Sequence, residues 1–265
     1  VVRIDDREIG DGAETFVIAE AGINHNGDVE LAEELVDEAA AAGADAIKFQ
    51  TYDTDQRVEE DSELYDVLDQ CELTPSETRS LFQYANDRGI PFFSTPFDVD
   101  SVELLDDLGV PAFKVASFHI THKRLLRAIA ETGRPVICST GMADREEVTE
   151  AAQLFREHDV PYVLLHCVSS YPTEPADANL EAVRTMKDVV DCPVGFSDHT
   201  LGTDVPGLAV AVGADAIEKH FTLDSAMEGP DHELSLEPDE LSAMVDRVRE
   251  VEAILGTGTI DLLDC

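Results

Sequence analysis

Basic residues are scarce in this chain. Its 265 residues include 18 Lys and Arg against 57 Asp and Glu, which gives a formal net charge of −39. A surface this acidic repels phosphate backbones and anionic lipids, so it argues against nucleic acid or a membrane as partner. Because the acids are spread over every segment and regular apolar runs are present, disorder is also disfavoured. We therefore expect a halophilic protein whose surface repulsion is screened by high salt.

Long hydrophobic runs and paired cysteines are also missing. No apolar run approaches the ~20 residues of a membrane span, and nothing resembles a signal peptide. The five cysteines are odd in number, scattered and without metal-type spacing. They are predicted to be reduced thiols of a cytoplasmic protein.

The apolar runs that are present alternate with helical patterns. Strands are predicted at 16–23, 45–52, 91–96, 111–117, 135–140, 161–167, 194–199 and 216–221. Residues 1–15 are expected to form an edge strand or arm, and 53–73 a partly helical connection. A Rossmann or flavodoxin-like sheet would need fewer strands and a Gly-rich first turn, which is absent. Eight strands alternating with eight helices predict an α/β fold, a (β/α)8 TIM barrel, as one catalytic domain over 1–265.

Polar residues gather at the predicted C-terminal strand ends, where the active sites of such barrels lie. These ends carry Glu20, Lys48, Gln50, Thr95, Lys114, Ser117, Ser139, Thr140, His166, His199 and His220. Two of the chain's five lysines lie there beside hydroxyls, although an unpaired buried charge costs several kcal/mol. This favours a functional rim over stray structural residues. Asn24 and His25, just past the first strand, are expected on the same rim without an assigned role.

Two histidines end the last two predicted strands. Side chains alternate faces along a strand, so Ser197 shares a face with His199 and Glu218 shares a face with His220. Neighbouring parallel strands would bring both imidazoles to one rim, which suits one divalent metal. A pair of core or surface histidines is the alternative interpretation.

The rim residues support more than one chemistry. Two lysines and several hydroxyls suit a phosphate and a carboxylate, and a metal could polarise a carbonyl. Glu20 could be a general acid or base, or only a salt-bridge partner of a rim lysine. These parts fit a phosphorylated enol condensing with an aldehyde. A Schiff-base aldolase using Lys114 or Lys48 is a rival, and a non-catalytic barrel that binds an anionic sugar is another.

Several motifs together resemble the sialic acid synthase family. They are FVIAEAGINHNG (16–27), IKFQ (47–50), STPFD (94–98), FKVAS (113–117), STGM (139–142), LHCVSSYP (165–172), GFSDHTLG (195–202), EKHFTLD (218–224) and GPDH (229–232). The resemblance implies a transferase that condenses phosphoenolpyruvate with an N-acetylated sugar aldehyde, releasing phosphate and a nonulosonic acid. N-acetylmannosamine and the hexoses of the legionaminic and pseudaminic acid branches remain open as the sugar.

Residue roles follow from the resemblance by position. Glu20 matches the catalytic carboxylate, and His199 and His220 match ligands of a divalent metal, usually Mn²⁺. The positions that match phosphoenolpyruvate contacts are Lys48, Thr95, Lys114, Ser117, Ser139, Ser169 and Ser197. Gln50, Tyr171 and Asp231 match residues that hold the amino sugar.

Two departures from the family pattern concern the sugar end of the site. His119 stands where the family usually has an acidic residue. The chain as given also stops where an antifreeze-like domain, which supplies an arginine to a partner subunit, usually begins. A homodimer is expected. Either a separate antifreeze-like protein or a local group such as His119 or Arg57 is expected to serve the sugar site.

Overall fold

The computed structural model describes residues 1–10, 12–256, 258 and 259. Eight parallel strands close into a barrel in chain order, with the last strand pairing with the first. They are β3 (Phe16–Gly22), β4 (Ala46–Thr51), β5 (Phe92–Pro96), β6 (Phe113–Val115), β7 (Val136–Ser139), β8 (Tyr162–Cys167), β9 (Val194–Asp198) and β10 (Ala216–His220). The predicted (β/α)8 barrel is confirmed.

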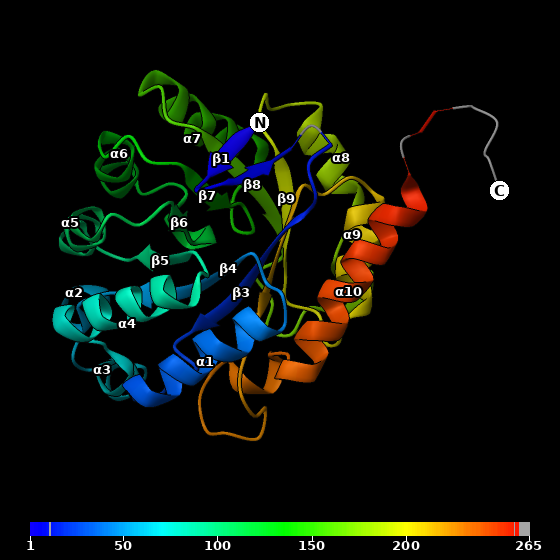
Figure 1. The fold of residues 1–265 in the computed structure, drawn as a ribbon. Helices are drawn as coiled ribbons and strands as arrows, with labels where there is room; N and C mark the ends of the chain where they lie inside the picture. The colour runs from blue at the N-terminus through cyan, green and yellow to red at the C-terminus, as the bar shows by residue number, and fades with distance from the viewer. Residues whose placement is uncertain (11, 257, 260–265) are drawn as a thin grey trace.

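Helices form an outer ring around these strands (Figure 1). One helix follows each strand or its loop: α1 (Val29–Ala41), α4 (Pro75–Arg88), α5 (Val99–Leu108), α6 (Lys123–Glu131), α7 (Arg145–Glu157), α8 (Glu181–Lys187), α9 (Asp204–Ala211) and α10 (Pro238–Leu255). A capping box starts α4, with Thr74 and Glu77 each accepting from the other's backbone. The acidic connection after β4 contains two short helices, α2 (Thr54–Arg57) and α3 (Tyr65–Cys71), as the sequence predicted.

Successive side chains of each barrel strand point alternately outward, toward the helices, and inward, into the barrel, so each strand contributes to two apolar cores. Outward residues such as Val17, Ala19 and Phe49 pack under the helices in the main cluster. Inward residues such as Phe16 and Ile18 fill the barrel interior in a second cluster. Because side chains alternate with a period of two, the next inward position after Ile18 is Glu20. The same register places site residues at the mouth of the barrel, one layer above the apolar interior.

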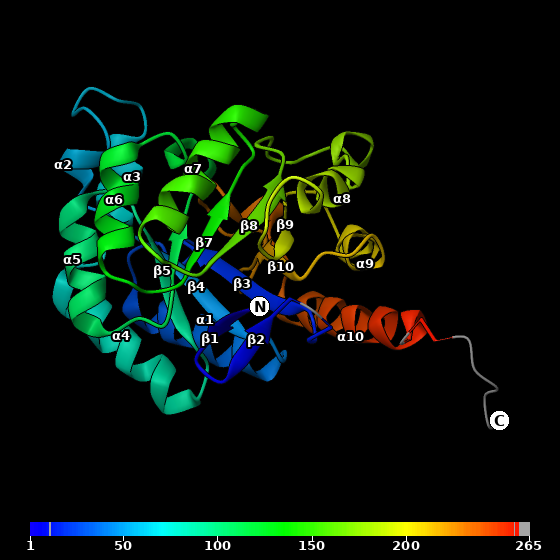
Figure 2. The ribbon, with the colours of Figure 1, turned by 90° about the horizontal axis from the view of Figure 1, so that it is seen from above.

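The opposite end of the barrel is closed by the chain's first residues. Strands β1 (Val2–Ile4) and β2 (Arg7–Ile9) form an antiparallel hairpin (Figure 2). Val2, Ile4 and Ile9 are buried in the interior cluster with Phe16. The predicted arm is therefore a plug that excludes water from the floor beneath the site. Within the described chain no helix is both long and apolar enough to cross a membrane.

Salt should stabilise this fold. With a formal net charge of −39, repulsion among surface carboxylates opposes the compact state. The Debye length falls from ~10 Å at 0.1 M to ~3 Å at 1 M, so added salt screens that repulsion. We expect the melting temperature to rise steadily from 0.1 M into molar KCl, measured by scanning calorimetry. An unchanged midpoint across that range would contradict adaptation of the surface to salt.

Candidate functional site

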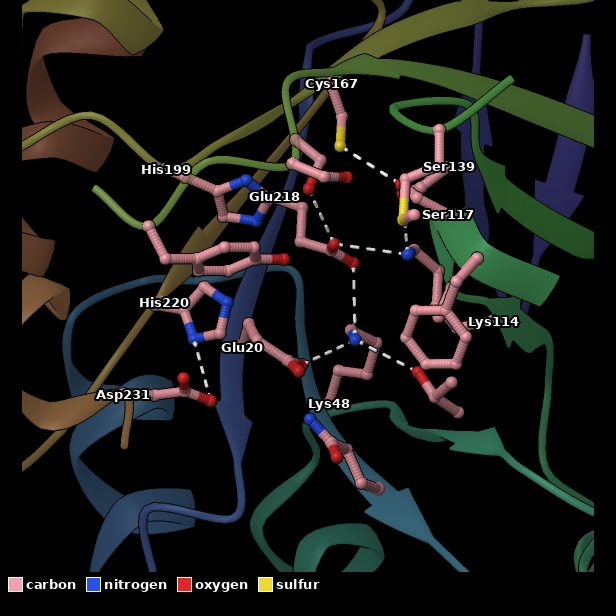
Figure 3. Close-up of a pocket in the computed structure, with 18 of the residues that line it drawn as sticks. Glu20, Lys48, Lys114, Ser117, Ser139, Cys167, His199, Glu218, His220 and Asp231 are labelled. Atoms are coloured by element: carbon pink, nitrogen blue, oxygen red, sulfur yellow. Dashed lines mark hydrogen bonds and ion pairs between the residues drawn. The ribbon is translucent and has the colours of Figure 1, made fainter. Parts of the chain in front are cut away.

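A cavity of about 360 Å³ opens at the C-terminal ends of the barrel strands (Figure 3). It brings together every residue that the sequence assigned to a site role: Glu20, Lys48, Gln50, Thr95, Lys114, Ser117, Ser139, Ser169, Tyr171, Ser197, His199, His220 and Asp231. The sequence assigned no site role to Met142, Cys167 and Glu218, which also line it, and Arg57, considered only as a local group for the sugar end, lines it as well. The roles of the predicted residues stay predictions, but their convergence into one cavity is observed.

Four charged side chains form the deepest part of the cavity. Lys48 Nζ lies 2.7 Å from Glu20 Oε2 and 3.7 Å from Glu218 Oε2. Lys114 Nζ lies 3.3 Å from Glu218 Oε1. Each of these side chains is at most 6% exposed, so the charges interact in a water-poor environment. Glu218 thus bridges the two lysines that the sequence placed at the rim.

Hydroxyl groups complete this charge cluster. Lys48 Nζ donates to Thr95 Oγ1 at 3.1 Å, and Lys114 Nζ donates to Ser139 Oγ at 2.8 Å. Ser197 Oγ donates to Glu218 Oε1 at 3.0 Å. Each ammonium group has three donors and three oxygen partners, so an incoming anion takes the place of one of these partners. The arrangement can therefore accept an anion without rebuilding the strands.

The two buried carboxylates differ in their protonation. Burial raises the pKa of Glu20, with the Glu218 carboxylate adding to this effect and Lys48 opposing it. Burial acts in the same direction on Glu218, but Lys114, Lys48 and the Ser197 hydroxyl hold its pKa below its ordinary value. Glu218 is therefore the permanent counter-charge of the lysines. Glu20 is the carboxyl group able to take up and release a proton near neutral pH.

The two predicted histidines lie beside each other on the cavity wall, with ring centroids 5.5 Å apart. His199 Nδ1 lies 2.8 Å from the carbonyl oxygen of Val168, which can only accept, so Nδ1 carries the proton and Nε2 keeps its lone pair. His220 Nδ1 is buried without a hydrogen-bond partner, and Asp231 Oδ2 lies 3.9 Å from it. Burial lowers the pKa of His199 to about 4 and that of His220 to about 3, so both rings are neutral at neutral pH.

These features fit a divalent cation held by two protein ligands. A neutral imidazole oriented by a backbone carbonyl is a common form of metal-ligating histidine. The orphaned nitrogen of His220 is a second indication, since buried polar atoms are rarely left unpaired. Among the residues that the structure describes, no group of three or more His, Cys, Asp or Glu side chains is arranged around a common metal position. Water or substrate oxygens would have to complete the shell.

An arginine also lines the cavity. Arg57 Nη1 donates to Gln50 Oε1 at 3.1 Å, and its guanidinium lies 3.7 Å from the ring centroid of Phe97. Burial lowers the pKa of Arg57 to about 10, which still leaves it charged at neutral pH. His119 instead lines an adjoining cavity of about 550 Å³ that shares Arg57. Of the two local groups considered for the sugar end, only Arg57 lines the cavity that holds the predicted site residues.

Some rim residues were predicted on the wrong side. His166 and Thr140 line a different cavity, between β7, β8 and α8, and His166 Nε2 lies 2.9 Å from the carbonyl oxygen of Ala178. The reason is alternation, because Leu165 and Cys167 point inward and His166 between them points outward. Asn24 and His25 are buried and do not line the cavity of the site residues, so the expectation that they share its rim was wrong.

His25 should make the protein sensitive to acid. Burial lowers its pKa to about 4, whereas an unfolded histidine titrates near 6.5. Between these values the unfolded state binds the extra proton, so the free energy of unfolding falls as pH drops from about 6.5 to 4, by at most about 3 kcal/mol from this group. Urea unfolding of the wild type and His25→Gln at pH 4.5 and 7 measures the effect. The variant should show the smaller pH dependence; equal dependence would assign the acid sensitivity elsewhere.

Comparison with known proteins identifies the family of this chain. The model of the NeuB family matches residues 35–260. The chain belongs to the NeuB family. The predicted sialic acid synthase resemblance is thereby confirmed, together with the predicted class of enzyme, a carbon–carbon bond-forming synthase of sialic acid-type biosynthesis.

Individual relatives of this NeuB-family chain span archaea and bacteria. It is 50% identical over 258 residues to an uncharacterized protein of Methanocaldococcus jannaschii, covering 97% of this chain and 77% of that one. It is 43% identical to the N,N'-diacetyllegionaminic acid synthase of Legionella pneumophila, covering 94% and 75%. The crystal structure of the N-acetylneuraminic acid synthetase of Leptospira borgpetersenii, in complex with citrate, superposes with a TM-score of 0.96 at 41% identity, covering 99% and 92%.

Proposed function

We propose that this protein condenses phosphoenolpyruvate with an N-acetylated hexose in its aldehyde form, giving a nonulosonic acid and inorganic phosphate. The observation that carries the proposal is the buried cluster of Lys48, Lys114, Glu218 and Glu20 beside two neutral histidines. The family relationship supports the same reaction class. N-acetylmannosamine and the di-N-acetylated hexoses are the candidate sugars.

The charge cluster suits an anionic substrate. Lys48 and Lys114 carry two positive charges, Glu218 carries one negative charge, and the raised pKa of Glu20 favours its neutral form when an anion approaches. With Glu20 protonated the cluster has one net positive charge. Phosphate and carboxylate groups would also accept from the hydroxyls of Thr95, Ser117, Ser139, Ser169 and Ser197.

The bond changes follow from the reactants. Carbon 3 of phosphoenolpyruvate attacks the aldehyde carbon, a carbon–carbon bond forms, and the aldehyde oxygen takes up the proton of the neutral Glu20 carboxyl group, which leaves Glu20 ionised. Water adds at carbon 2, its proton passes to Glu20, and the tetrahedral intermediate expels phosphate by cleavage of the C2–O bond. Glu20 is placed for this role because its raised pKa lets it act as a base near neutral pH.

The remaining residues hold the sugar and its carbonyl. Gln50, Tyr171 and Asp231 line the same cavity, and Arg57, which is bonded to Gln50, adds a fixed cation to it. His199 and His220 would hold a divalent cation, proposed as Mn²⁺, which when bound supplies a Lewis acid for a carbonyl oxygen. A homodimer is also proposed, and light scattering would test it.

The rival chemistries fit the cavity less well. A Schiff-base aldolase needs a neutral lysine, but Glu20 and Glu218 raise the pKa of Lys48 although burial opposes this. A purely sugar-binding barrel leaves unexplained why a carboxyl group with a raised pKa is buried against two lysines. Neither rival uses the paired neutral histidines.

A sugar panel tests the proposal. Purified protein, phosphoenolpyruvate and Mn²⁺ are mixed with N-acetylmannosamine, 2,4-diacetamido-2,4,6-trideoxyhexoses or N-acetylglucosamine as control, and inorganic phosphate and product mass are followed. We expect phosphate release with at least one of the first two classes and a product equal in mass to sugar plus pyruvate. Absence of phosphate release with every sugar would refute the proposed function.

A further inference from the structure

The sequence motif at 23–27 lies outside the substrate cavity but is joined to it through side chains. Asn26 Nδ2 donates to the carbonyl oxygen of Glu228 at 3.0 Å. Its Oδ1 therefore faces His232 Nε2, 3.2 Å away, and accepts the hydrogen carried by that nitrogen. His232 Nδ1 is left as an acceptor for the Thr222 hydroxyl at 2.7 Å. Asn26 thus makes hydrogen bonds to both ends of the short segment 228–232.

Asn24 ties the same loop at two further points. Its Nδ2 donates to the carbonyl oxygen of Phe221 at 2.8 Å and to Ser235 Oγ at 3.0 Å. Ser235 Oγ in turn donates to the carbonyl oxygen of Asp231 at 2.6 Å. The chain of hydrogen bonds ends on the backbone of a cavity residue, whose carboxylate lies 3.9 Å from His220 Nδ1.

Backbone geometry shows that the segment 228–232 packs closely against Asn26. Gly229 has φ +154, and a Cβ there would lie 2.6 Å from His232 Cδ2 and 3.1 Å from Asn26 Oδ1. Only glycine allows the loop to come this close to the turn. Asn26 itself has φ +51, a conformation that asparagine tolerates better than most residues. The turn and the loop are therefore matched to each other over some 200 residues of sequence separation.

We infer that Asn24 and Asn26 are positioning residues that hold the loop after β10 so that Asp231 faces the sugar. We call this set of hydrogen-bonded side chains the clasp. Asn24 and Asn26 form one half of the clasp, and Thr222, His232 and Ser235 form the other. The inference rests on the proposed function for the identity of the ligand. It adds that the turn after the first barrel strand, which touches no substrate, sets the affinity for the sugar and leaves the phosphoenolpyruvate end unaffected.

Asn26→Gly tests the clasp, because glycine keeps the positive φ and removes both side-chain hydrogen bonds. Loss of these two hydrogen bonds should raise the sugar KM by about 10-fold, which corresponds to about 1.4 kcal/mol, while the phosphoenolpyruvate KM changes less than 2-fold. Amide hydrogen exchange of 222–236, followed by mass spectrometry, should accelerate by a similar factor. Asn26→Asp, which restores only the acceptor for His232, should recover part of the sugar affinity.

Asp159→Gly is the matched control, since Asp159 also has a positive φ, of 54°, and lies far along the chain from both halves of the clasp. It should leave both KM values and the exchange of 222–236 unchanged. Unchanged sugar KM and exchange in Asn26→Gly would overturn the inference, as would equal losses at both substrates together with a lower melting temperature. If the wild type turns over no sugar, the proposed function fails, and unchanged exchange would still refute the clasp by itself.

Discussion

Glu20→Gln is expected to lower kcat by ~100- to 10,000-fold, the usual cost of losing a general acid or base. The substitution keeps the shape of the side chain but removes its ability to exchange a proton. Because Lys48 and Lys114 keep Glu218 as a counter-charge, phosphoenolpyruvate binding should weaken far less. Steady-state kinetics and calorimetric titration of phosphoenolpyruvate measure the two effects separately.

A matched control for this variant is Glu72→Gln. Glu72 accepts from the backbone and hydroxyl of Thr54 and lies outside the cavity, so its loss should leave kcat near that of the wild type. Wild-type turnover in Glu20→Gln would reassign Glu20 to a salt bridge with Lys48. A loss confined to phosphoenolpyruvate affinity would reassign it to the binding of that substrate.

Removal of the divalent cation is expected to abolish turnover. His220→Ala deletes one of the two proposed imidazole ligands, so the variant should purify with less than a tenth of the wild-type metal content and show no measurable turnover. The fold should persist, because the interior apolar cluster beneath His220 is untouched. Metal analysis after dialysis, circular dichroism and the phosphate assay provide the three readouts.

His166→Ala is the control, because His166 is a buried histidine that bonds a backbone carbonyl outside the substrate cavity. It should keep its metal and its activity. Chelation of the wild type should stop turnover, and Mn²⁺ should restore it. Full activity after exhaustive metal removal would contradict the assignment of both histidines and would return attention to an aldolase mechanism.

Much of this site could be predicted because strand alternation is local. Once Glu20 or His220 is assigned to the inward face of its strand, a period of two specifies which neighbours share that face. The same rule applied to the predicted strand 161–167 would have placed His166 on the outward face. The last inward residue of that strand is Cys167, and nothing in the sequence indicated a function for it. One residue of register separates a cavity side chain from one under a helix.

Contacts between distant segments were not predictable in this way. Glu218 was placed on the face of His220, yet its partners Lys48 and Lys114 lie on strands more than 100 residues away. Arg57 is the last residue of α2, a helix of 4 residues that is too short to show periodicity, so nothing local indicated that it would stack on Phe97 and reach Gln50. Such pairings depend on barrel closure, which brings the first and last strands together.

The most direct test of the account follows one oxygen atom. Phosphoenolpyruvate labelled with ¹⁸O at the bridging oxygen is turned over with the preferred sugar, and the phosphate and nonulosonic acid are analysed by mass spectrometry. If carbon 3 attacks the aldehyde and water adds at carbon 2, the label leaves with phosphate, and one phosphate forms per acid. Label retained in the sugar acid, or acid formed without phosphate, would contradict the proposed reaction.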